Sequence, residues 1–217
     1  MFWGQHTEVT SVKYLGVWLD ETLSGFEHAT MVIKKISSRI GFLFRHSGLL
    51  DRKCRKLLCM ALVQPLFDYC SSSWYSALSS KLKDRLDALQ RKMVRFTFGF
   101  NYRRSVDLSH LSSLGWLTVG DRVRYFKLIH THKIFNGVAP KYISDSFRNF
   151  SSFHAYNTRG SQTDYLISKE DSSGSIMFSS FSYTAKSEWN RLSGGLKSLT
   201  KLENFKSKLR EYLFKRY

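Results

Sequence analysis

Neighbouring acidic residues are the first place to look for metal-dependent chemistry in this chain. Two-metal phosphoryl transfer needs paired carboxylates that hold divalent ions on the attacking and leaving oxygens. Asp20-Glu21 and Glu170-Asp171 are adjacent acids, but neither stands in an aromatic-Ala-Asp-Asp hairpin context, and no Asp-Asp pair occurs. Both pairs are typical of turns, and the sequence has no phosphate-binding glycine loop, dinucleotide glycine pattern or nucleophile elbow. We therefore predict no catalytic residue.

Cysteine and histidine residues give no metal-ligand pattern. Cys54 and Cys59 are five positions apart on a predicted helix, and His130 and His132 point nearly opposite ways on another. Because zinc-knuckle spacing is also absent, we predict neither a metal site nor a cofactor. His130 falls on the apolar face of its helix, which favours a core histidine over a ligand. The three cysteines lack framework spacing and indicate reduced thiols in an intracellular protein.

Positive charge is the strongest feature of the sequence. Lys and Arg total 34 against 17 acidic residues, a formal net charge of +17. Such an excess of positive charge destabilises the compact state by self-repulsion. An enzyme that acts on a small metabolite has no need of it. A polyanionic partner would explain it, and nucleic acid is the commonest one, with an anionic membrane surface as the alternative. No run of about 18 apolar residues appears, so we expect no membrane-spanning segment.

The cations are gathered in three blocks. Residues 31–60 hold eight basic groups against one acidic group, residues 81–104 hold eight against two, and residues 197–217 hold seven against two. Cations near a phosphate backbone release counterions, and the aromatic residues interleaved with them over 96–104 could stack on bases. The opposing interpretation is that these rings are core and the charges only solvate helix faces. Nucleic-acid contact is predicted for Lys34, Lys35, Arg39, Arg45, Arg52, Lys53, Lys56, Arg91, Lys92, Arg95, Arg103 and Arg104.

Hydrophobic periodicity predicts a mainly α-helical bundle preceded by a short β-strand or hairpin. The run over residues 12–19 reads as a strand, because it is rich in β-branched and aromatic residues. Gly16 within it indicates a bulge or a close approach by another backbone. Asp51 is a suitable N-cap, and Pro65 should kink or split its helix. The helices of the bundle are expected over residues 22–45, 51–75, 82–96 and 118–136.

The last third of the chain gives a weaker pattern. Residues 141–187 are rich in Ser and Phe and are expected to form short strands and turns. Thr200 and Glu203 fit a capping box in front of a final helix that carries Leu202 to Leu213. The first twenty residues lack a basic segment followed by an apolar one, so we expect a nuclear or cytoplasmic protein that is not secreted.

Short motifs follow one another along most of the chain. Lys13 to Asp20 reads KYLGVWLD, Leu62 to Cys70 reads LVQPLFDYC with Trp74 after it, and residues 86–95 read LDALQRKMVR. Further matches are residues 34–45, 114–118, 133–137, 158–159, 189–190 and 205–206, together with Arg122. In this order the motifs resemble the region after the catalytic palm in jockey-like reverse transcriptases of non-LTR retrotransposons. The resemblance extends from about Val12 to Leu213 and rests on the order of the set.

The resemblance implies a domain organisation and a primer-grip site. Residues 1–21 would be the end of the palm, residues 22–137 a helical thumb-like domain, and residues 138–217 a C-terminal extension with short strands and a final helix. Tyr14, Leu15 and Gly16 would form a primer-grip-like element near the primer terminus.

The same resemblance assigns the thumb helix a role on the duplex. Gln90, Arg91 and Arg95 would face or brace an RNA–DNA hybrid, held by its backbone while the palm performs the chemistry.

The departures from the family are large, because the fingers, the palm aspartates and the endonuclease are all missing. The start at Met1 suggests a truncated element or a remnant. The chain alone is then expected to be no enzyme, and Mg²⁺ belongs only to the intact parent polymerase. Its expected partners are RNA, DNA or their hybrid and, in the parent polyprotein, a palm and fingers domain, with no membrane and no small-molecule substrate. The alternative is a non-catalytic helical protein-interaction module or an inert retroelement relic.

Overall fold

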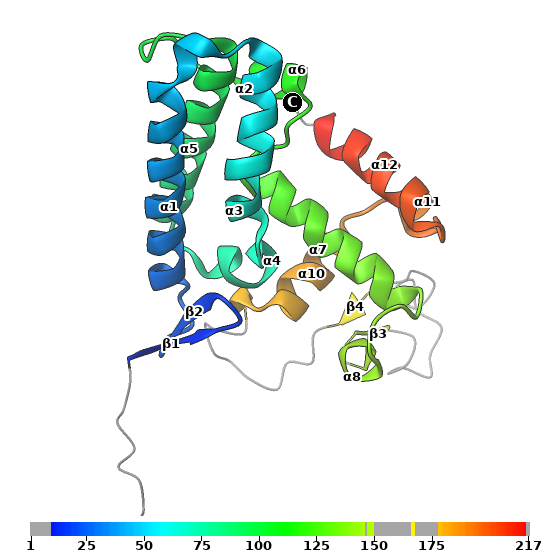
Figure 1. Ribbon diagram of the computed structural model, residues 1–217. Helices are drawn as coiled ribbons and strands as arrows, with labels where there is room; N and C mark the ends of the chain where they lie inside the picture. Colours follow the sequence, from blue (N-terminus) through cyan, green and yellow to red (C-terminus); the bar gives the residue numbers. More distant parts are fainter. Residues whose placement is uncertain (1–9, 146, 150–165, 168–177, 216–217) are drawn as a thin grey trace, which may run out of the picture.

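The computed structural model describes residues 10–145, 147–149, 166–167 and 178–215. The protein is mainly helical, with a two-stranded antiparallel hairpin near its start, as the sequence predicts (Figure 1). The first part contains β1 (Ser11–Tyr14), β2 (Val17–Asp20), α1 (Phe26–Arg45), η1 (Ser47–Leu49), α2 (Arg52–Leu58), η2 (Cys59–Val63), α3 (Gln64–Asp68), α4 (Ser71–Trp74), η3 (Tyr75–Ala77) and α5 (Ser80–Phe98). The second part contains α6 (Leu108–Leu114), α7 (Val119–Phe135), α8 (Lys141–Ser144), β3 (Arg148–Asn149), β4 (Leu166–Ile167), α10 (Phe181–Asn190), α11 (Gly194–Lys197) and α12 (Leu202–Phe214).

The N-terminal strands form a tight hairpin instead of one continuous strand. Tyr14 pairs with Val17, and the two residues between them have positive φ, 45° at Leu15 and 85° at Gly16. Positive φ at both central residues is the geometry of a turn whose twist matches that of the paired strands. The expected bulge at Gly16 is therefore wrong, and the glycine serves the reversal of the chain.

A three-helix layer of α1, α2 and α5 forms the first core. The apolar stripe of α1 packs against that of α5, and both stripes follow the predicted helical period. Asp51 caps α2 as expected, because its Oδ1 accepts a hydrogen bond from the Cys54 amide at 2.7 Å. The predicted helix over 51–75 is interrupted as expected, since Pro65 lies in the first turn of α3, directly after the π-helical turn η2. It ends earlier than expected, at Asp68.

A second core lies on the other side of α7, which packs against α10 and α12 (Figure 1). The two buried clusters meet at Trp116 to Val119, at the start of α7, whereas the sequence placed a boundary after residue 137. His132 is the buried histidine of α7: its ring stacks on Phe205, with the centroids 4.3 Å apart. His130 is exposed, so the expectation of a core histidine at that position is wrong.

Two further expectations for the C-terminal part are wrong. Residues 181–190, expected within a region of strands and turns, form the helix α10, whose N-cap Ser180 accepts a hydrogen bond from the Tyr183 amide. The final helix occurs as predicted, but its N-cap is Lys201 without a side-chain cap, so the capping box from Thr200 to Glu203 does not form. Most of the segment 141–187 lies outside the described residues, and its described strands β3 and β4 pair antiparallel.

Candidate nucleic-acid interface

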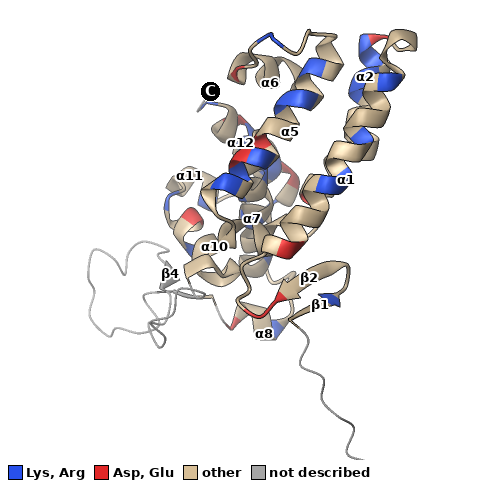
Figure 2. Cartoon of the chain, turned by 90° about the vertical axis from the view of Figure 1, so that its left-hand side faces the viewer, with Lys and Arg blue, Asp and Glu red and all other residues tan. Residues whose placement is uncertain are grey.

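The predicted cations lie on the outer sides of α1, α2 and α5 and on the loop after α5. Figure 2 looks at this side of the molecule and shows the basic residues along α5, on α1 and at the start of α2. Nearly all of them are exposed, and Lys56 and Arg95 are half-buried. The exposed members are Lys34, Lys35, Arg39, Arg45, Arg52, Lys53, Arg91, Lys92, Arg103 and Arg104.

These cations differ in their partners from several cations of α7 and α12. Arg122 pairs with Asp68, Arg124 with Glu188, and Lys208 with Glu211. The predicted cations of α1, α2, α5 and the loop after α5, in contrast, form no ion pair with any residue that the structure describes. Longer-range attraction to a carboxylate acts at two of them. Burial raises the pKa of Asp87 and Arg91 opposes this rise, whereas hydrogen bonding lowers the pKa of Asp51 and Lys53 lowers it further.

Two arginines are fixed by aromatic rings at the end of the layer where α5 terminates. Phe98 and Phe100 stack with their centroids 4.8 Å apart. The guanidinium carbon of Arg52 lies 4.1 Å from the Phe98 centroid, and that of Arg104 lies 4.0 Å from the Phe100 centroid. The stacked rings thus hold two cations from α2 and from the loop after α5 in one column, through cation–π contacts.

The aromatic residues over 96–104 divide between the two interpretations that the sequence left open, core packing and stacking on bases. Phe96 is buried core, Phe98 and Phe100 are half-buried, and Tyr102 is 74% exposed. The guanidinium of Arg103 lies over the Tyr102 ring at 5.5 Å from its centroid. Only the end of the run therefore offers a ring face to an external base.

Gln90 does not lie on the surface, so the prediction that it faces or braces a duplex is wrong. The residue is 4% exposed, and its Nε2 donates a hydrogen bond to the Leu117 carbonyl at 2.8 Å. Its Oε1 accepts a hydrogen bond from the Val119 amide at 3.2 Å. Both ends of the amide are therefore engaged in joining α5 to the first residue of α7.

The primer-grip-like residues lie far from the Arg52–Arg104 column. Tyr14, Leu15 and Gly16 form the exposed tip of the hairpin, and the Tyr69 hydroxyl donates a hydrogen bond to the Leu15 carbonyl. The hairpin adjoins the first residues of α1, while the loop after α5 lies near its last ones (Figure 1). A 20-residue helix spans about 30 Å, so the fold keeps the two predicted groups apart.

Two further cations on α5 belong to the same surface but were not among the predicted site residues. Lys81 and Arg85 are exposed and precede Lys92 and Arg95 at positions that share a helix face. The helical spacing of these four residues was the signal that could have identified them. Arg55, in contrast, is structural: its Nη2 donates a hydrogen bond to the Ser47 carbonyl at 2.7 Å.

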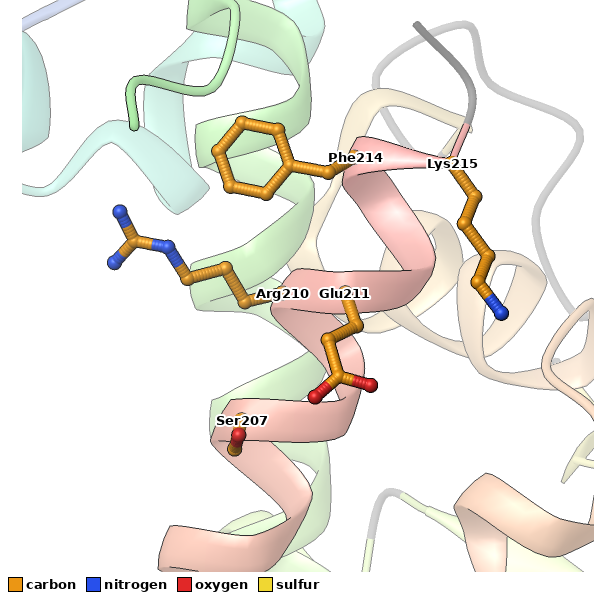
Figure 3. Close-up of a pocket in the computed structure, with 5 residues that line it drawn as sticks. All are labelled: Ser207, Arg210, Glu211, Phe214 and Lys215. Carbon is orange, nitrogen blue, oxygen red and sulfur yellow. The ribbon is translucent and has the colours of Figure 1, made fainter. Parts of the chain in front are cut away.

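Other surfaces offer less for chemistry. Figure 3 shows a depression on α12 that is lined by Ser207, Arg210, Glu211, Phe214 and Lys215. The side chains of Arg210 and Phe214 extend to one side of the helix and that of Lys215 to the other. The depression mixes both signs of charge, and Arg210 already donates a hydrogen bond to the Gly115 carbonyl. Among the described residues, no three His, Cys, Asp or Glu side chains gather as a metal site. Within the same residues, no helix has the length and apolarity needed to cross a membrane.

Comparison with known proteins adds no assignment. No protein-family model matches the sequence, and no significant match occurs among curated proteins or among solved structures.

Proposed function

We propose that this chain binds nucleic acid through the cations of α1, α2 and α5, and that it derives from the thumb and post-thumb region of a retroelement reverse transcriptase. The observation that carries the binding proposal is the row of exposed arginines and lysines on these helices that form no ion pair with a residue that the structure describes. Their spacing along helices suits contacts with successive phosphates, which need no base sequence. The ordered motifs described above support the origin.

The proposed ligand is RNA, DNA or an RNA–DNA hybrid held by its backbone. Counterion release makes such binding strongly salt-dependent, with a slope of about −0.9 in log–log form for each neutralised phosphate. A filter-binding titration of the full chain against a labelled hybrid, between about 50 and 200 mM salt, measures this slope. Absence of salt-dependent binding to every nucleic acid tried would refute the proposal.

Matched variants separate the proposed surface from charge in general. Lys34→Ala combined with Lys81→Ala removes two exposed cations of the surface, whereas Lys201→Ala combined with Lys208→Ala removes one at the N-cap of α12 and one within that helix. We expect the first pair to reduce the salt slope by about 2 and the second to leave it unchanged. Equal effects of both pairs would show that net charge alone drives binding.

The proposal includes no polymerase chemistry in this chain. The catalytic aspartates and Mg²⁺ would belong to a palm in the parent protein, together with its fingers. Primer extension on an RNA template with Mg²⁺ tests this part, and nucleotide incorporation by the purified chain would overturn it. A role on nucleic acid implies a place inside the cell, in the nucleus or the cytoplasm.

A second candidate function is a helical protein-interaction module, which one observation favours. Large apolar side chains are exposed around the hairpin and the start of α1: Val12, Tyr14, Leu15, Leu23 and Phe26. Such a patch is typical of a surface that another protein covers, and a palm would be that protein in the parent. Self-association at micromolar concentration in light scattering, without nucleic-acid affinity, would favour this function over the first.

A further inference from the structure

A groove of about 460 Å³ opens between α1 and α5, below the loop that follows α5. Ser37, Gly41 and Phe44 of α1 line one side of it. Lys92 and Arg95 line the other side. Its size lies within the range of roughly 300–1,000 Å³ that is usual for small-ligand sites. The small residues on α1 explain why the groove is open at this point of the helix pair.

The charge of the groove selects an anionic occupant. No acidic residue lines it, and neither Lys92 nor Arg95 forms an ion pair with a residue that the structure describes. The Arg95 Nε donates to the Arg104 carbonyl at 3.0 Å, and its terminal nitrogens form no hydrogen bond with a residue that the structure describes. A phosphate group is the ligand chemistry that two such cations suit.

The aromatic rings of the groove select an occupant with a flat face. Phe100 and Tyr102 come from the loop, and Phe44 contributes a partly exposed ring from α1. Phe98 covers one face of Phe100, and Arg104 lies over the Phe100 ring at 4.0 Å from its centroid. Arg103 lies farther from the Tyr102 ring, at 5.5 Å from its centroid, and Tyr102 is 74% exposed, so Tyr102 is the better stacking surface. Bases stack on such rings only where they are not stacked within a duplex.

The loop that carries these rings is ordered by its own hydrogen bonds. The Phe100 amide donates to the Arg95 carbonyl at 2.9 Å, and the Arg104 amide donates to the Asn101 carbonyl at 3.0 Å. The Arg103 Nε also donates a hydrogen bond to the Tyr102 hydroxyl at 2.9 Å. A loop ordered before binding loses less conformational entropy when a base stacks on one of its rings.

We propose that the groove between α1 and α5 binds single-stranded RNA or DNA, with one base on Tyr102 and the adjoining phosphates on Lys92 and Arg95. This inference rests on the proposed nucleic-acid function and extends it, because it assigns single strands to the groove and leaves duplexes to the outer cations.

The test measures fluorescence anisotropy of the full chain with a labelled oligothymidylate and with a blunt RNA–DNA hybrid of the same length. Tyr102→Ala should weaken binding of the single strand by roughly 5-fold to 100-fold, the range expected for losing one stacked base, and should leave the hybrid unaffected. Tyr102→Phe keeps the ring and should retain the affinity. Tyr142→Ala is the matched control, since Tyr142 is 77% exposed on α8, away from the groove.

Each result decides a different part of the proposal. Unchanged single-strand affinity in Tyr102→Ala, or an equal loss for both ligands, overturns the groove assignment. Binding of the hybrid without binding of the single strand also overturns it but leaves the proposed function standing. Failure of both ligands to bind the wild-type chain refutes the proposed function itself. As a second readout, Lys92→Ala should reduce the salt slope for the single strand by about 0.7.

Discussion

Arg122 of α7 and Asp68 of α3 form a bidentate ion pair across the boundary between the two cores. The Arg122 Nη2 lies 2.7 Å from Asp68 Oδ2, and its Nε donates to Oδ1. Both side chains are about three-quarters buried, and Gln64 donates a further hydrogen bond to Asp68 Oδ1 at 3.1 Å. The pair therefore ties α7 to α3.

Asp68→Asn should destabilise the protein by about 1–2 kcal/mol, because a charge-assisted fork becomes a weaker neutral contact and leaves the guanidinium without its counter-charge. Urea unfolding followed by circular dichroism measures the change. Glu211→Gln breaks the exposed Lys208 pair and serves as the control, with an expected cost of about 0–0.5 kcal/mol. Equal losses in the two variants would contradict the role assigned to Asp68.

Gly99→Ala should destabilise the protein more than Gly137→Ala. Both glycines have positive φ, 72° and 70°, so an alanine is strained at either place by about 1 kcal/mol. At Gly99 the added Cβ would also lie 2.7 Å from Arg55 Nη1, whereas at Gly137 it would meet nothing within 4 Å. Thermal unfolding of the two variants measures this, and the additional loss of melting temperature in Gly99→Ala is attributed to the displacement of Arg55. Equal losses in the two variants would show that Arg55 moves without an energetic cost.

Lys127 should make stability rise with pH above about 8. Its Nζ is buried and donates to Thr184 Oγ1 at 2.7 Å and to Ser76, and burial lowers its pKa from 10.5 to about 8. Between these two values the unfolded chain binds a proton that the folded chain does not, so the free energy of unfolding increases with pH. Urea unfolding between about pH 8 and 9 should give a positive slope in the wild type. Above about pH 9 the buried thiol of Cys59 acts in the opposite direction, because burial raises its pKa from 9.0 to about 11.

Lys127→Met is the control for that slope, because it removes the titrating group and keeps an apolar stem. Its free energy of unfolding should vary less with pH in the same window. A variant that retains the full slope would assign the dependence to another group. Tyr75 is no competitor below pH 10, since burial raises its pKa and both states keep its proton there.

Gln90→Leu should cost about 1–3 kcal/mol of stability, because it leaves the Leu117 carbonyl and the Val119 amide buried without partners. The folded variant should bind nucleic acid as the wild type does, since the side chain does not reach the surface. Thermal unfolding and filter binding on the same preparation provide the two measurements. Lost affinity without lost stability would restore a contact role to this glutamine.

The positions of the main helices could be predicted from the local sequence pattern, whereas the residues of the candidate site could be predicted only in part. The apolar period located α1 and α5, and Pro65 marked an interruption, because both effects act within a few residues of the chain. The burial of Gln90 depends on α7, which the pattern around residue 90 cannot reveal. The same limit applies to the Arg52–Arg104 column, which brings together side chains that are distant in sequence.

Where the sequence was ambiguous, tertiary packing decided the outcome. The run over 12–19 has strand composition throughout, but Leu15 adopts a positive φ that its residue type disfavours, with the Tyr69 hydroxyl bonded to its carbonyl. The apolar face of α7 is poorly defined in the sequence, so either His130 or His132 could have been the core residue. The position of α12, with Phe205 beside His132, determined which one became buried.

The π-helical turn η2 has a consequence for the insertion and deletion of residues. There the Gln64 amide bonds to the Cys59 carbonyl, one residue farther back than in an α-helix, so α2 and α3 differ in helical phase. Each residue of an α-helix turns the chain by about 100°. Deleting Ala61 would return the two helices to a common phase and swing Gln64 and Asp68 away from α7. The extra residue of this turn sets the orientation of α3 toward α7. The chain should therefore tolerate a substitution at this turn better than an insertion or a deletion.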